Sequence, residues 1–389
     1  MAESAPAPHH DVRDASALEA DLTLAGDVAF VGSGAGGGVA AEVLAEAGLK
    51  VVLIEEGPYR TARDFNMREA WAYPELYQES AARKTKDKAI TILQGRAVGG
   101  STTVNWTTSF RAPPETLGHW RARHGLGEFT EAALAPWFAR MEARLGIAPW
   151  ALAPNPNNAA LARGAARLGW SHGVISRNVR GCLDLGYCGL GCPVDAKQSM
   201  LVTTIPAALE GGATLLTRCR AERLEITGDR VSAVDCAAMD EVGIRPSGRR
   251  LRVEARHVVL AGGAIGTPAL LLRSGVPDPH GRLGRRTFLH PVCVSTAIMA
   301  EAIEGWSGAP QSIYSDHFLW RGGVSGALGY KIETPPTYPV IAATVFKSFG
   351  AGHADELAKL PHAHTLIALL RDGFHGQSAG GEVGLRDDG

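Results

Sequence analysis

The segment between residues 27 and 55 constrains the fold of this chain more than any other. A short apolar run, DVAFV at residues 27–31, leads directly into the glycine-rich stretch GSGAGGG. Gly32, Gly34 and Gly37 match the pattern GxGxxG, and a second apolar run, VVLIE, ends at Glu55. A strand, a tight turn, a helix and a second strand in this order are typical of a dinucleotide-binding βαβ unit. We therefore expect an α/β fold built on a Rossmann-like FAD/NAD(P)-binding domain.

Each residue type in this segment has a physical role. The first glycine makes the tight turn, the second lets backbone approach a pyrophosphate, and the third allows the helix to pack closely on the strand. The N-terminus of the helix offers free N–H groups and the positive end of its dipole to phosphates. Glu55 is placed to accept hydrogen bonds from ribose hydroxyls. The motif by itself does not separate NAD from FAD.

Composition and charge exclude several other classes of protein. The chain has 389 residues, of which 45% are hydrophobic and 20% are charged, as in ordinary globular proteins. A formal net charge of -1 gives no electrostatic case for binding nucleic acid or a membrane surface. Glycines and a proline interrupt the longest apolar run, HVVLAGGAIGTPALLL, so we expect no transmembrane segment. The N-terminus shows no secretory signal pattern, and we expect a cytoplasmic protein.

Two further glycine-bearing segments follow the dinucleotide motif. The first is LQGRAVGGSTTVNWTTSFRAP at residues 93–113, where a pair of glycines precedes several small polar side chains. The second is HVVLAGGAIGTPALLLRSGV at residues 257–276. It predicts a strand, a Gly-Gly turn and a helix that begins near Thr267 and Pro268, since threonine is a good N-cap and proline suits a first turn.

Together these segments resemble the glucose–methanol–choline (GMC) family of FAD-dependent oxidoreductases. The resemblance covers residues from about 24 to 389, and a weaker match is the pair His290-Pro291. It implies noncovalent FAD, because Val104 stands where some members attach the flavin through a histidine. The residues that the resemblance assigns to FAD are Gly32, Ser33, Gly34, Gly37, Glu55, Val98, Gly99, Gly100, Ser101, Thr102, Asn105, Trp106, Ala221 and Gly263.

The resemblance also predicts the domain organisation. We expect an N-terminal tail at residues 1–23 and an FAD-binding domain at residues 24–286. The FAD-binding domain would carry a helical insertion at about residues 112–175 and a cysteine loop at residues 181–197. Residues 287–389 would form a partial substrate-binding domain on an antiparallel sheet, truncated at its C-terminus.

The cysteine loop, GCLDLGYCGLGCPVDAK, contains three of the six cysteines. Cys182, Cys188 and Cys192 are spaced Cys-x5-Cys-x3-Cys, and thiolates on such a loop can converge on one metal centre. Certain bacterial FAD-dependent glucose dehydrogenases of the family look similar here and carry an iron–sulfur cluster on three cysteines. We therefore treat these three residues as candidate ligands of an iron–sulfur cluster. A Cys188–Cys192 disulfide and free thiols remain the alternatives.

The resemblance implies oxidation of the CH–OH group of an alcohol or sugar, with hydride transfer to the flavin. A cluster would favour a dehydrogenase that passes electrons to an acceptor protein or a quinone. An oxidase that uses oxygen, and an FAD-binding fragment without catalysis, are the alternatives. An NAD-dependent dehydrogenase would require the 93–113 segment to match by accident.

No catalytic residue is assigned from the sequence. The general base of the family, a histidine paired with a second histidine or an asparagine, lies in the last quarter of a full-length member, which we expect this chain to lack. The last residues, GGEVGLRDDG, lead into the hairpin signal Asp388-Gly389 without a returning strand. We therefore expect a truncated chain that ends in an unpaired strand.

Overall fold

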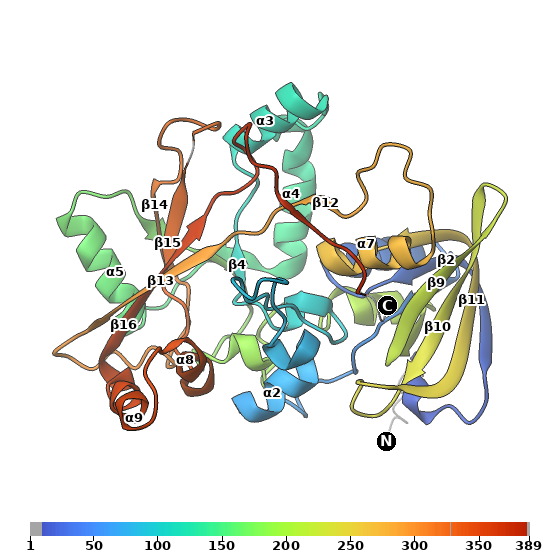
Figure 1. The fold of residues 1–389 in the computed structure, drawn as a ribbon, viewed down its shortest axis with the longest axis horizontal. Coiled ribbons are helices and arrows are strands. Elements are labelled where there is room, and N and C mark those ends of the chain that lie inside the picture. Colours follow the sequence, from blue (N-terminus) through green and yellow to red (C-terminus); the bar gives the residue numbers. More distant parts are fainter. Residues whose placement is uncertain (1–9, 327, 387–389) are drawn as a thin grey trace, which may run out of the picture.

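The computed structural model describes residues 10–326 and 328–386 (Figure 1). Its largest element is a seven-stranded sheet in the order β1-β8-β3-β2-β11-β10-β9. The neighbours β1, β8, β3, β2 and β11 run parallel, and β10 and β9 continue the sheet antiparallel. The strands are β1 (Asp11–Asp14), β2 (Leu22–Val31), β3 (Val51–Ile54), β8 (Thr214–Thr217), β9 (Cys219–Thr227), β10 (Arg230–Met239) and β11 (Pro246–Leu260). This parallel arrangement confirms the predicted Rossmann-like fold class.

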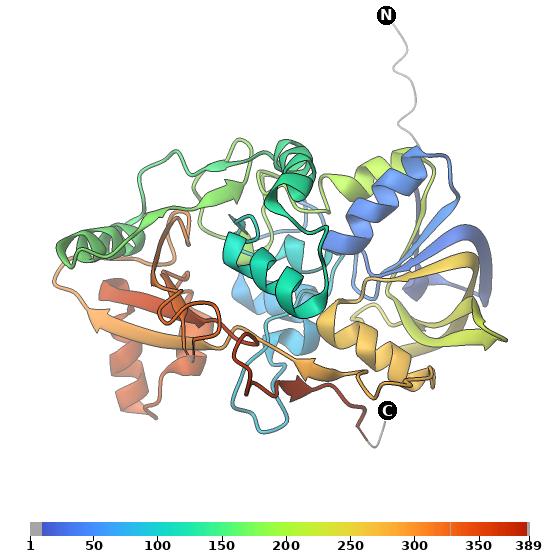
Figure 2. The same cartoon turned by 90° about the horizontal axis from the view of Figure 1, so that it is seen from above.

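The central strands of this sheet are buried on both faces. Side chains alternate along a strand, so Phe30 and Leu53 enter one core cluster, while Ala29 and Val52 enter a second cluster on the opposite face. Helix α1 (Ala35–Glu46) and helix α6 (Thr204–Glu210) pack together beside the first cluster, and α7 (Gly263–Arg273) lies across the sheet from them (Figure 2). The uninterrupted apolar run of β3 follows from this double burial.

A second, five-stranded sheet lies at the other end of the molecule (Figure 1). Its order is β13-β16-β15-β14-β6, and each neighbouring pair is antiparallel. Helix α5 (Pro156–Arg167) packs on it, with Leu161 against Ile313 and Phe318. The strands are β6 (Gly173–Val174), β13 (Val292–Ile298), β14 (Ile313–Phe318), β15 (Tyr330–Glu333) and β16 (Ala363–Leu370).

Smaller elements connect the two sheets. Helices α2 (Glu69–Leu76), α3 (Pro114–His124) and α4 (Glu131–Leu145) lie between them in Figure 1. A three-stranded sheet contains β4 (Thr108–Ser109), β5 (Ile147–Pro149) and β7 (Ser176–Asn178). Helices α8 (Pro339–Val345) and α9 (Ala351–Ala358) accompany the second sheet, and β12 (Arg285–Thr287) pairs with β17 (Gly381–Glu382). Among residues 10–326 and 328–386, every helix is too short or too polar to traverse a lipid bilayer.

Three segments differ from the sequence-based expectation. Residues 11–14, expected in an N-terminal tail, form strand β1 and pair with β8. Helix α5, expected in an insertion of the FAD-binding domain, packs on the second sheet, and strand β6, from the same expected insertion, is an edge strand of that sheet. The last strand was expected to be unpaired, but residues 381–382 pair with β12. The hairpin signal Asp388-Gly389 lies outside the described residues, and the domain boundaries stay a prediction.

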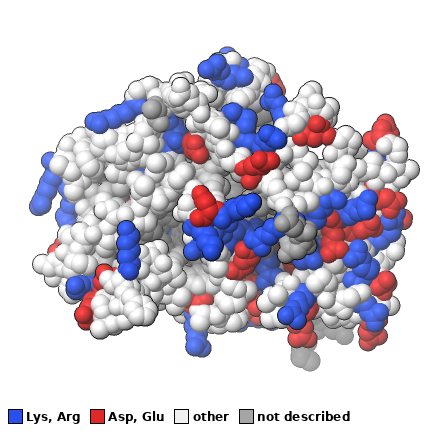
Figure 3. Space-filling model, viewed as in Figure 1, with Lys and Arg blue, Asp and Glu red and all other residues white. Residues whose placement is uncertain are grey.

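Acidic and basic side chains alternate over the antiparallel strands of the large sheet. Arg252 on β11 forms ion pairs with Glu225, Asp235 and Glu254, and Arg250 pairs with Glu222. Figure 3 shows charges of both signs over this part of the molecule and fewer charges over the second sheet. Since exposed pairs each contribute roughly 0–1 kcal/mol, this region is a solvated surface rather than a source of stability.

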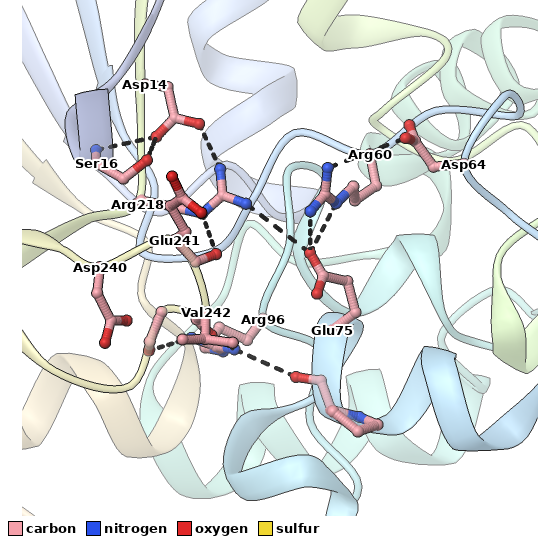
Figure 4. A network of polar contacts seen from close by, with 12 residues as sticks. Asp14, Ser16, Arg60, Asp64, Glu75, Arg96, Arg218, Asp240, Glu241 and Val242 are labelled. Atoms are coloured by element: carbon pink, nitrogen blue, oxygen red, sulfur yellow. Dashed lines mark hydrogen bonds and ion pairs between the residues drawn. The ribbon is translucent and has the colours of Figure 1, made fainter.

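A buried arginine ties strand β1 to helix α2. Arg218, whose side chain is 8% exposed, pairs with Asp14, the last residue of β1, and with Glu75 of α2 at 3.9 Å (Figure 4). Its Nε also donates to the carbonyl of Glu241 at 2.9 Å. Arg60 binds the same Glu75 carboxylate. The network therefore joins the edge strand β1 to helix α2 and to Arg60, which follows β3 in the chain.

We predict that Arg218→Met lowers the free energy of unfolding by about 1–3 kcal/mol, because it removes a buried donor from Asp14, Glu75 and the carbonyl of Glu241. The matched control is Arg13→Met, which removes a pair whose side chains are 40% and 41% exposed. This control should change stability by less than about 1 kcal/mol. Denaturant unfolding of both variants checks the prediction, and equal losses would contradict it.

Candidate cofactor site

The first glycine turn packs directly on the segment that follows strand β11. Gly32 has φ of +105°, and a Cβ atom there would lie 2.5 Å from the carbonyl oxygen of Ala261. A Cβ atom on Gly37 would lie 2.0 Å from the carbonyl oxygen of Gly32. Both positions therefore require glycine, and Gly37 has the close-packing role that the sequence predicted.

The N-terminus of helix α1 is open to a ligand. No side chain of the described residues caps this helix, and its N-cap residue is Gly34. A Cβ atom built on Gly36 would meet nothing within 4 Å. The first N–H groups of a helix lack intrahelical partners and attract anions, so this turn fits a phosphate group.

The side chain of Ser33 joins the glycine turn to the 93–113 segment. Its hydroxyl donates to Oε2 of Glu55 at 2.6 Å and accepts a hydrogen bond from the backbone N–H of Gly99 at 3.0 Å. Glu55 also accepts from the backbone N–H of Ser33 at 3.2 Å and of Gly57 at 2.8 Å. One buried hydroxyl thus fixes three parts of the site relative to one another.

Glycines allow the two loops to touch. Gly99 and Gly100 have φ of +87° and +57°, and a Cβ atom on Gly100 would lie 2.8 Å from the Cα of Gly34. Gly263, with φ of +78°, begins helix α7 close to the backbone on which Gly32 packs. The structure therefore brings together three glycine-bearing segments that are far apart in the sequence.

The remaining predicted residues occupy different places around these loops. Thr102 donates to the carbonyl of Gly99 and accepts from the N–H of Met200, and Ser101 accepts from the N–H of Gly95. Val98 is fully buried in the core, and the side chain of Asn105 accepts from the N–H of Thr107. The ring of Trp106 packs on Gly189 of the cysteine loop. Ala221 lies on β9, whose first residue, Cys219, donates to the carbonyl of Glu55 at 2.9 Å.

Glu55 is 6% exposed, and its burial raises the pKa of its carboxyl group, although the hydrogen bonds from Ser33 and Gly57 oppose this effect. The ribose-binding role of Glu55 stays a prediction. Its Oε2 already accepts two hydrogen bonds from Ser33, whereas Oε1 accepts one from Gly57 and can accept a second one.

The raised pKa of Glu55 predicts how stability depends on pH. Because its pKa in the folded protein lies above the usual value of 4.5, ionisation of Glu55 costs stability as the pH rises through this range. The Glu55→Gln variant lacks this cost, so its stability relative to the wild type should increase as the pH rises above the usual pKa of 4.5. Urea unfolding across this range tests the sign. A constant difference between the two proteins would contradict it.

Lys197 is a site residue that the sequence analysis missed. It is 3% exposed, and its Nζ donates to the carbonyls of Thr103 at 2.5 Å, Asn105 at 3.0 Å and Cys188 at 2.7 Å. Burial lowers its pKa to about 8. Lys197 therefore holds the 93–113 segment against the cysteine loop. A single lysine in a polar loop gives no sequence signal for such a role.

The three cysteines of the loop are free thiols and half-buried. Within the described ranges, no three side chains of His, Cys, Asp or Glu gather as they would to hold a metal ion. The group beside Cys188 is instead Arg177, whose Nη2 donates to the sulfur at 3.4 Å. The structure therefore gives the candidate iron–sulfur cluster no support.

A cavity of about 250 Å³ lies between the start of α3 and the second sheet. Lys331 and Glu333, which share a face of β15, line it together with Arg371, and so does His290 of the His-Pro pair. The ammonium of Lys331 lies 3.5 Å from the ring centre of Phe110, which follows the 93–113 glycines in the chain. The contact of Lys331 with Phe110 therefore links the cavity wall to the 93–113 segment. The wall of the cavity carries both charged and apolar groups.

Comparison with known proteins identifies the family. Residues 73–292 match the family model for GMC oxidoreductase. An uncharacterised GMC-type oxidoreductase of Mycobacterium tuberculosis is 34% identical over 96% of this chain and 60% of its own length. A long-chain-alcohol oxidase of Arabidopsis thaliana is 32% identical over 89% of this chain and 47% of its own length. The chain belongs to the GMC oxidoreductase family, and it spans 60% or less of the length of these two relatives.

Solved structures support the same fold. Pyridoxine 4-oxidase from Mesorbium loti aligns with a TM-score of 0.59 at 20% identity and covers 88% of this chain and 71% of its own. Formate oxidase from Aspergillus oryzae aligns with a TM-score of 0.62 at 14% identity, over 90% of this chain and 73% of its own. At these identities the likeness concerns the fold alone.

Proposed function

We propose that this chain binds FAD noncovalently and contributes to an oxidoreductase that acts on the CH–OH group of an alcohol or sugar. Family membership supports the flavin and the general reaction. The observation that carries the proposal is the meeting of the 32–37, 99–103 and 261–263 segments around an uncapped helix N-terminus. Such a cradle of backbone N–H groups and glycines fits a pyrophosphate.

The residues of the cradle divide the task of holding FAD. Gly32, Gly34 and Gly37 would admit the pyrophosphate to the start of α1, and Glu55 would accept from the ribose. The 98–106 segment and Gly263 would line the remaining part of the cofactor, and backbone near Ala221 would contact the adenine. Val104 has no nucleophile, and it is 4% exposed, in keeping with noncovalent binding. When bound, FAD supplies the hydride acceptor.

The site gives less information about which molecule accepts the electrons from FAD. The preference for a dehydrogenase depended on a cluster at the cysteine loop, and no metal-binding group of three side chains occurs in the described part of the chain. Two relatives from Arabidopsis thaliana are named long-chain-alcohol oxidases. We therefore infer that FAD oxidises an alcohol. A dehydrogenase and an oxidase are equally well supported.

Flavin binding without turnover is the second candidate. The observation behind it is that the chain matches 60% of the length of the mycobacterial relative. The activity of a whole relative therefore need not belong to this chain. No catalytic base is assigned to a described residue.

The test is an absorbance spectrum of the purified protein, followed by turnover of primary alcohols with a redox dye under nitrogen and with oxygen alone. We expect flavin bands, and substrate-dependent reduction of the dye without added nicotinamide. Flavin bands without turnover would support the second candidate. Loss of both would contradict FAD binding, and activity that needs added NAD would contradict the assignment to FAD.

A further inference from the structure

The cavity beside the second sheet has two cationic side chains in its wall that form no ion pair. Lys331 lies on β15, and Arg371 directly follows β16. Within residues 10–326 and 328–386, neither side chain pairs with an Asp or a Glu. The cavity volume of about 250 Å³ is below the roughly 300–1,000 Å³ of sites for drug-sized ligands, so the cavity suits a small molecule.

The strand register places both cations on one face of the sheet. Lys331 pairs with Leu369 between β15 and β16, and the backbone N–H of Arg371 donates to the carbonyl of Gly329 at 2.7 Å. Arg371 is therefore a diagonal neighbour of Lys331, and such neighbours are roughly 7–8 Å apart, within reach of long side chains. Glu333 lies two residues along β15 on the same face. One small anion can therefore contact both cations.

The ammonium of Lys331 has donors that the protein leaves free. It lies 3.5 Å from the ring centre of Phe110 and 4.8 Å from that of Tyr314. Aromatic faces attract a cation, but among the described residues no oxygen accepts a hydrogen bond from this Nζ. Burial lowers the pKa of the amine, although Glu333 and Asp316 oppose this effect. A ligand oxygen would supply the acceptor that is missing.

Arg371 is held in one orientation by its neighbours. The central carbon of its guanidinium lies 4.8 Å from the ring centre of Trp320 and 5.5 Å from that of Phe374. Its Nη2 donates to the carbonyls of Gly323 at 3.1 Å and Gly326 at 3.3 Å. Its Nη1 is buried and has no hydrogen-bond partner in the described part of the chain. An unpaired buried donor costs free energy, and an acceptor on a ligand would remove this cost.

Glu333 is the one acidic residue among the described residues of the wall. It is 3% exposed, and its Oε2 accepts a hydrogen bond from Nε2 of Gln311 at 2.6 Å. Burial raises the pKa of its carboxyl group and so favours the neutral form, although Lys331 opposes this effect. Two cations thus accompany a single acid that already has a partner, and the charge of the wall favours an anion over a cation.

We propose that this cavity binds a small organic acid, with the carboxylate at Lys331 and Arg371 and the apolar part against the aromatic and leucine side chains of the wall. Charge-assisted hydrogen bonds from lysine and arginine are the usual way to hold a carboxylate. For the proposed oxidoreductase, the substrate is then a hydroxy acid. This last assignment rests on the proposed function, whereas binding of the acid does not.

The cavity borders the segment that we assign to FAD. Pro113 belongs to its wall, and Phe110 contacts Lys331. Phe110 follows Asn105 by five residues, so their Cα atoms are at most about 18 Å apart. A carboxylate at Lys331 is therefore near the 93–113 segment, as the carboxylate of a substrate should be.

The first experiment measures ligand binding to the purified full chain by isothermal titration calorimetry. The probes are phenylacetate, its neutral amide phenylacetamide and the cation 2-phenylethylammonium, which share an aromatic ring and differ in charge. We expect phenylacetate to bind at least about tenfold more tightly than the other two, because only a carboxylate pairs with both cations. Equal binding of the three probes, tighter binding of the amide or the ammonium, or no binding of phenylacetate would overturn the proposal.

Variants locate the binding site. Lys331→Met should weaken the binding of phenylacetate about tenfold or more, since it removes the charge but keeps a long unbranched side chain. The matched control Lys347→Met removes an exposed lysine outside the cavity wall and should bind as the wild type does. Glu333→Gln keeps an acceptor for Gln311 and removes a like charge, so it should tighten binding.

An unchanged dissociation constant in Lys331→Met, or weaker binding in Glu333→Gln, would contradict the proposed site. Should Lys331→Met fail to fold, Glu333→Gln and the comparison of the three probes on the wild type still decide the matter.

The second experiment tests the substrate class. It compares kcat/KM for 4-(hydroxymethyl)benzoate and benzyl alcohol, with the full chain supplied with FAD and a redox dye. We expect the acid to be preferred about tenfold or more. A kcat/KM for the acid no higher than that for benzyl alcohol would overturn the hydroxy-acid assignment. Tight binding of phenylacetate without turnover of either alcohol would support the binding site and contradict the proposed oxidation, so the two failures are distinct.

Discussion

The hydroxyl of Ser33 is the interaction on which the arrangement of the site depends. It donates to Glu55 at the end of β3 and accepts from the backbone of Gly99 in the 93–113 segment. A buried hydroxyl with both of these bonds fixes two loops that are otherwise linked by tight glycine contacts. The start of α1 has no side-chain cap because its N-cap residue is Gly34, and the hydroxyl of the preceding Ser33 is bound to Glu55.

A second constraint acts from the other side of the 93–113 segment. Lys197 binds two of its carbonyls and one carbonyl of the cysteine loop. Its burial is tolerable because each of its three donors has an acceptor. Ser33 and Lys197 therefore hold opposite ends of the same short segment, the first through a neutral hydroxyl and the second through a charged amine. The segment is positioned by residues from two distant parts of the chain.

The glycine motif and the apolar strands could be predicted because their signals are local. Gly32, Gly34 and Gly37 are adjacent in sequence, and VVLI of β3 is apolar because both of its faces are buried. Strand β1 could not be predicted, since its sequence DVRD has no apolar alternation and its pairing with β8 includes a bond from Thr214 to Asp11. Helix α5 packs on strands that follow it by more than a hundred residues.

The cysteine loop shows a different limit of sequence spacing. The Cys-x5-Cys-x3-Cys pattern correctly places three thiols on one loop, but it does not show where their side chains point or what lies beside them. The neighbours of Cys188 are Arg177 on β7 and the buried amine of Lys197, and the contact with Arg177 depends on tertiary packing. The spacing first suggested metal ligation, but no group of three side chains able to hold a metal ion occurs among the described residues.

The central claim is that Ser33 and the three glycine-bearing segments form the FAD site. The most direct test is the dissociation constant of FAD, measured by titration of flavin-free protein for the wild type, Ser33→Ala and the control Ser232→Ala on β10. The account predicts that Ser33→Ala weakens binding by about tenfold or more, because its loss leaves Glu55 and Gly99 without a shared partner. Ser232→Ala should bind as the wild type does. Equal affinity of the wild type and Ser33→Ala, or no binding of FAD by the wild type, would contradict the account.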